Sequence, residues 1–161
     1  PLLGTATGGN WHDFGHSTTN EASLDMRKIH QFHSQKVAAL LAQLDVPEPG
    51  FAGTYLDHCI LYYGNEQGGH ADHSYDNRPV LIAGSGGGVL QTNKFIDYSL
   101  GPNGQEDYNR LLVTFAQAMG LAQADYYTAD MQARGISPGF GDDRGANANR
   151  ANPLPGVMVG G

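Results

Sequence analysis

The sequence predicts an α/β domain in which a short, mostly parallel sheet is flanked by two main helices, with long irregular segments at both termini. Two stretches of helical periodicity, ending near residues 44 and 119, supply the helices. Between them lie two short apolar runs, 59–63 and 80–83, with the length and the β-branched or aromatic content of buried strands. Because the first run scarcely alternates with polar residues, both of its faces should be covered, which favours a parallel strand between helices.

Composition limits what the chain can be. Its 161 residues suffice for one domain with its own core. A formal charge of −7 and only nine Lys plus Arg argue against nucleic acid or an anionic membrane as the main partner. No apolar run is long enough to predict a membrane span. The single cysteine, Cys59, is most simply a small buried apolar residue, so it does not indicate a compartment.

The chain divides into three parts. Residues 1–20 are a histidine-containing N-terminal loop, 21–134 are the α/β domain, and 135–161 are a tail rich in Gly, Asn and Pro. The tail is either disordered or lies along another subunit. Because the chain starts at Pro1 without a signal sequence, we also expect a missing N-terminal segment as a partner, with self-association as the other possibility.

The first helix is the clearest element, from residue 21 to about residue 44. Ser, Thr and Asn residues before it can cap its first turn, and Pro47 prevents it from continuing. His30 and His33 share one face of this helix, and packing is the favoured role for His33. The apolar stripe consists of Leu24, Ile29, Phe32, Val37, Leu40, Leu41 and Leu44.

The two strands should follow. The first is expected over 57–63, with His58 in a structural role, and the second over 80–83. The glycine-rich run 84–88 could cradle an anion with its backbone amides, but a tight turn into a third strand at 89–90 is favoured.

The rest of the chain is expected to hold one more strand and one more helix. Residues 94–99 are a candidate strand, and 101–104 are a turn. The second helix should run from residue 105 to about residue 119, with Met119 in its packed stripe. After Asp125 the helical pattern decays.

Two groups of side chains could ligate a metal ion. The segment 11–16 holds His12, Asp13 and His16, and imidazole and carboxylate are common ligands of Zn²⁺ and related ions. The alternative is a surface loop with solvated histidines. The loop between the strands is also rich in imidazole and carboxylate, at the place where an open α/β sheet carries a site. Its members are Glu66, His70, Asp72, His73 and Asp76.

The order of these features resembles the C-terminal part of the DUF1552 family, over about residues 10–145. The resemblance is carried by Gly64-Asn65-Glu66, by the segment from His73 to Gly84 (HSYDNRPVLIAG) and by the helix from Asn109 to Gly120 (NRLLVTFAQAMG). Members of this family are exported bacterial proteins of unestablished function, similar in architecture to the alkaline phosphatase and sulfatase superfamily. The resemblance therefore implies a partial alkaline phosphatase-like sandwich in a periplasmic or extracellular protein.

The resemblance also implies a metal site. Its ligands would be His12, His16, Glu66 and His73, which suffice for one divalent ion, zinc or calcium. His16 and His73 should then approach one another. A further set, Asp13, His70 and Asp76, would form an outer shell or contact substrate. The site departs from the superfamily pattern, because His12 replaces an acid and Asn65-Glu66 replaces an Asp-His pair.

Two functions remain open. One is an exported, non-catalytic structural or assembly subunit that can bind a metal ion, and it is slightly favoured by the altered ligands and the irregular termini. The other is a metal-dependent phosphoric or sulfuric ester hydrolase. Its nucleophile would have to come from the missing N-terminal part, because the superfamily places that residue near the start of the domain.

Overall fold

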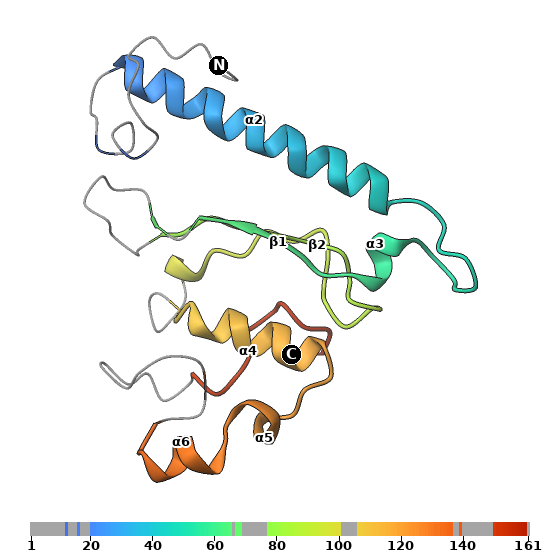
Figure 1. Cartoon of the computed structure of the whole chain (residues 1–161), viewed down its shortest axis with the longest axis vertical. Helices are drawn as coiled ribbons and strands as arrows, with labels where there is room; N and C mark the ends of the chain where they lie inside the picture. The colour runs from blue at the N-terminus through green and yellow to red at the C-terminus, as the bar shows by residue number, and fades with distance from the viewer. Residues whose placement is uncertain are drawn as a thin grey trace.

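Helices make up most of the regular structure (Figure 1) in the computed structural model. It describes residues 12, 16, 20–65, 67–68, 77–100, 106–136, 139 and 150–160. The helices are α2 (Asn20–Leu44), α3 (Tyr55–His58), α4 (Asn109–Ala118), α5 (Gln123–Tyr126), α6 (Ala129–Ala133) and a short 3-10 helix (Tyr98–Leu100). The strands are β1 (Leu61–Gly64) and β2 (Val80–Ala83). The long first helix and the strand over 80–83 are thus confirmed.

The sheet contradicts the predicted fold class. In the described part of the chain it consists of β1 and β2 alone, paired antiparallel with Leu61 opposite Ala83 and Gly64 opposite Val80. The α/β prediction of a short, mostly parallel sheet flanked by two main helices, as part of an alkaline phosphatase-like sandwich, is therefore wrong. The apolar run that favoured a parallel strand instead packs one face on α4, where the rings of Tyr62 and Phe115 meet edge to face at 6.0 Å.

The strand expected over 57–63 begins four residues late, at Leu61, because a helical turn takes the place of its first part. The backbone N–H of Asp57 donates to the hydroxyl of Thr54, and the Thr54 N–H donates to the Asp57 carboxylate at 2.8 Å. This capping box satisfies two donors at the start of α3 and fixes the turn. His58 has the predicted structural role, because its ring pairs with Glu48 and contacts Phe51.

Several expectations further along the chain also fail. Leu90 forms a single bridge with Met158 instead of a third strand, and residues 94–99 are not a strand. Met119 is 75% exposed, so the packing role predicted for it is wrong. The helical pattern does not end at Asp125, since α6 follows.

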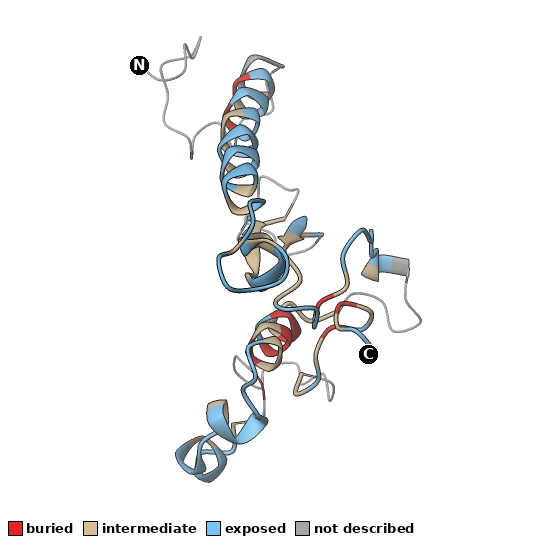
Figure 2. Cartoon of the chain, turned by 90° about the vertical axis from the view of Figure 1, so that its right-hand side faces the viewer, coloured by how far each residue is buried: buried red, intermediate tan, exposed pale blue. Residues whose placement is uncertain are grey.

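The core lies between α4 and two segments that pack beside it. Its buried members are Leu90, Leu111, Leu154 and Val157. Figure 2 shows buried residues gathered on α4 and its neighbours, whereas α2 and α6 are largely exposed. Because Leu154 and Val157 come from the segment 150–160, this segment packs back onto its own chain.

Arg110 fixes the C-terminal segment to α4. Its side chain is buried, its Nε donates to the carbonyl of Asn152 at 3.1 Å, and its Nη2 donates to that of Pro153 at 2.7 Å. Its Nη1 pairs with Glu106. A little further along α4, the Thr114 hydroxyl accepts from the backbone N–H of Leu154 at 2.8 Å.

Replacing Arg110 by Met should lower the free energy of unfolding by about 2 to 3 kcal/mol, because Glu106 and two carbonyls lose their partner together. Urea denaturation followed by circular dichroism measures the change. The matched control is Arg134→Met, whose pair with Asp130 is exposed and should contribute almost nothing. Equal losses in the two variants would contradict the role of Arg110.

Candidate functional site

Two of the predicted metal ligands lie together. His12 and His16 have helical backbone, so the prediction that residues 1–20 are all loop is wrong at these positions. A spacing of four residues places both rings on one face of a helical turn. Their Nε2 atoms are 3.0 Å apart and their ring centroids 4.6 Å apart. The contact is a hydrogen bond, so one of the two Nε2 atoms carries its proton. Two nitrogens bound to one tetrahedral Zn²⁺ at 2.0–2.1 Å lie about 3.3 Å apart, so loss of that proton and a small shift of the rings would suit one zinc ion.

The rest of the predicted site lies outside the described residues. This applies to Asp13, Glu66, His70, His73 and Asp76, and so the expected approach of His16 to His73 stays a prediction. Within the part of the chain that the structure describes, no three His, Cys, Asp or Glu side chains form a group that could hold a metal ion. His12 and His16 alone fill two of the four positions that a zinc ion requires.

The glycine-rich run 84–88 forms the predicted turn. Its amides bond within the protein: the Gly86 N–H donates to the carbonyl of Cys59, the Gly87 N–H donates to that of Asp57 at 2.8 Å, and the Gly88 N–H donates to Ser85. These amides are therefore not aimed at an anion, and the alternative of an anion cradle has no support in this geometry.

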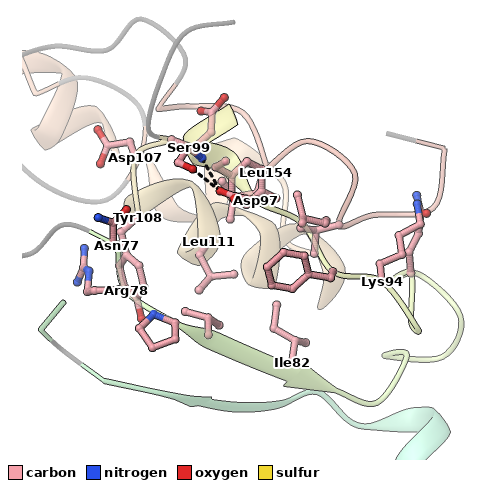
Figure 3. A pocket seen from close by; sticks show the side chains of 18 of the residues that line it. Asn77, Arg78, Ile82, Lys94, Asp97, Ser99, Asp107, Tyr108, Leu111 and Leu154 are labelled. Carbon is pink, nitrogen blue, oxygen red and sulfur yellow. Dashed lines mark hydrogen bonds between the residues drawn. The ribbon is translucent and has the colours of Figure 1, made fainter. Parts of the chain in front are cut away.

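A pocket of about 570 Å³ opens between β2, the segment 91–99 and α4 (Figure 3). Its floor is apolar and its rim is polar. Ile82 and Leu111 face one another across the floor, whereas Arg78 and Lys94 stand at opposite ends. This volume falls in the range of small-molecule sites. Sequence reasoning missed the pocket, because four segments distant in the chain build it. The apolar residues that line it are Val80, Ile82, Phe95, Ile96, Leu111, Leu154 and Val157.

The acidic groups of the pocket are engaged by neighbours. Glu106 pairs with Arg110, and Asp107 pairs with Arg150. Hydrogen bonds from the hydroxyl and the backbone N–H of Ser99 hold the pKa of Asp97 below its ordinary value. Arginines therefore offset the charges of Glu106 and Asp107, whereas Asp97, held by the neutral Ser99, keeps its negative charge.

Tyr108 forms a flat wall at one end of the pocket. The guanidinium carbon of Arg78 lies 3.8 Å from the centre of its ring, an arrangement that combines cation–π attraction with stacking. The Tyr108 hydroxyl also bonds to that of Tyr62. Burial, and then the bond to Tyr62, raise the pKa of Tyr108 to about 12, so the phenol stays neutral at physiological pH.

A second candidate site is a surface at the C-terminal end of α2. We define the α2 apolar end as residues 37–44, which have the sequence VAALLAQL and carry no charge. Val37, Leu41 and Leu44 are partly buried toward the rest of the chain. Leu40 lies beside Val37 and Leu44 on the helix surface and is 45% exposed. Alanines occupy the other side of the helix, so Gln43 is the one polar side chain at this end.

Comparisons with protein-family models, with curated proteins and with solved structures returned no match for this chain. The resemblance to the DUF1552 family, and the activity and export that it implies, therefore stay predictions. Among the described helices, none has both the length and the apolar character that crossing a bilayer requires.

Proposed function

We propose that this chain is a structural or assembly module without catalytic activity of its own, and that it pairs with a second copy through the α2 apolar end. The observation that carries the proposal is the exposure of Leu40 on a helix end whose one polar side chain is Gln43. Consistent with the resemblance noted above, we propose that the module works outside the cytoplasm.

The lack of charge on the α2 apolar end permits pairing with a second copy. Two chains of net charge −7 repel one another overall, but the α2 apolar end has no charge to oppose its own image across a two-fold axis. Val37 and Leu44, three and four positions from Leu40, lie next to it on the helix surface and extend the apolar contact that it offers to a second copy. Gln43 is the only polar side chain of this segment.

Light scattering coupled to size-exclusion chromatography tests the proposal. It should give twice the monomer mass of 17.2 kDa at micromolar concentration. The same preparation should release no phosphate or sulfate from aryl esters in the presence of zinc or calcium. A monomer at all accessible concentrations would reject the pairing, and metal-dependent turnover would reject the non-catalytic role.

The spacing of His12 and His16 favours a second candidate function, the binding of one divalent ion, as the metal-dependent hydrolase also requires. We propose that the two Nε2 atoms serve as two ligands and that Glu66 and His73 complete the set. Imidazole binds metal only when its nitrogen is deprotonated, so the affinity should fall as the pH is lowered.

Replacing His12 by Ala should lower the affinity for zinc about tenfold or more, because one of the few protein ligands is lost. Isothermal titration with zinc chloride measures the change. His30→Ala, at an exposed position on α2, removes an imidazole outside the proposed ligand set and should leave the affinity unchanged. Equal losses in both variants would mean that zinc binds to scattered surface histidines.

A further inference from the structure

The pocket between β2 and α4 takes no part in the proposed assembly through α2. Val80 and Ile82 are separated by two positions on one strand, so they share the face of the hairpin that is turned toward this pocket. Leu111 lies across from Ile82 (Figure 3) and is buried in the core. A rigid core thus supports an apolar floor that remains accessible through the pocket.

The polar groups of the rim are not equivalent. The acidic side chains Glu106 and Asp107 are each paired with an arginine, whereas Asp97 accepts two hydrogen bonds from the neutral Ser99 and keeps its charge. Lys94 is exposed at one end of the floor. Its ammonium group is therefore available to a ligand that lies along the floor.

The opposite end offers a planar surface. There the guanidinium of Arg78 lies over the ring of Tyr108. The Tyr108 hydroxyl bonds to that of Tyr62, which fixes the position of the ring. Stacked Arg and Tyr side chains suit contact with the ring of a ligand. The neutral phenol of Tyr108 adds no negative charge that would repel an anion.

We propose that this pocket binds an organic anion with an apolar, ring-containing body. The body lies on Val80, Ile82 and Leu111, and the anionic group faces Lys94. The volume of about 570 Å³ accommodates a molecule of two or three rings.

The probe is 8-anilinonaphthalene-1-sulfonate, added to the whole chain and followed by fluorescence and by amide shifts in NMR spectra. The expected shifts cluster at residues 77–82, 91–99 and 106–111. The uncharged analogue N-phenyl-1-naphthylamine should bind more weakly at the same residues. Shifts confined to the α2 apolar end would overturn the proposal, because the probe would then report only a general apolar surface.

Two substitutions separate charge from apolar contact. Lys94→Gln should weaken binding about threefold, the worth of one exposed ion pair, and Lys36→Gln on α2 is its matched control. Val80→Thr keeps the volume but adds a hydroxyl to the floor, and should weaken binding about fivefold. Its control is Val46→Thr, at an exposed valine outside the pocket. Binding that neither Lys94→Gln nor Val80→Thr changes would also overturn the proposal.

Discussion

Replacing Leu40 by Glu is expected to convert the proposed dimer into monomers. The substitution removes an apolar side chain from each copy, so a two-fold symmetric interface loses two leucine contacts. At about 1.5 kcal/mol for each lost leucine contact, the dissociation constant should rise at least about 100-fold. The buried carboxylates add a further cost. Sedimentation velocity of the two proteins at equal concentration measures the change.

The control for this experiment is Ser34→Glu, which adds the same charge to an exposed position of the same helix. It should leave the dimer intact. Circular dichroism should report equal helix content for both variants, because Leu40 makes a small contribution to the fold of a single chain. If Leu40→Glu and Ser34→Glu behaved alike, the α2 apolar end would not be the interface.

Replacing Gly84 by Ala should lower the free energy of unfolding by about 4 kcal/mol. Gly84 has a φ of +87°, which L-residues with a side chain rarely adopt. An added Cβ would lie 2.2 Å from the carbonyl oxygen of Cys59 and 2.7 Å from that of Leu56. Because both obstacles are backbone atoms, the turn after β2 would have to move away from the end of α3. Thermal or urea denaturation measures the loss.

Gly87→Ala measures the cost of the backbone conformation without a clash. Gly87 has a φ of +76°, similar to that of Gly84, but an added Cβ would meet nothing within 4 Å. Its replacement should therefore cost only about 1 kcal/mol, the penalty for the left-handed conformation. Losses of the same size at both positions would show that the close approach of Gly84 to Cys59 does not occur in solution.

The elements that were predicted correctly are those with strong local signals. α2 follows a run of capping residues and ends before Pro47, and the residues of β2 are apolar and β-branched or small. The turn at 54–57 also has a local signal, a Thr followed three residues later by Asp, but the apolar residues after it dominated the interpretation. The local sequence does not distinguish a parallel from an antiparallel partner, since β1 would be apolar in either case.

The elements that were missed depend on distant contacts. Leu154 and Val157 belong to a segment without periodicity, and they become core residues only because Thr114 and Arg110 hold the backbone of that segment against α4. Residues from four distant segments line the pocket, and no local sequence pattern predicts it. The spacing of four between His12 and His16 brings the two rings together only in a helical turn, and the sequence predicted a loop there, so their contact did not follow from the spacing alone.

Contacts between labelled and unlabelled copies test the central claim most directly. A mixture of methyl-labelled and unlabelled chains, studied by isotope-filtered NOE spectroscopy, reports only protons that meet across the interface. Pairing through α2 predicts intermolecular contacts from the methyl groups of Leu40 to those of Leu40, Val37 and Leu44 in the other copy. Intermolecular contacts that arise elsewhere, or none at concentrations where the mass is that of a dimer, would contradict it.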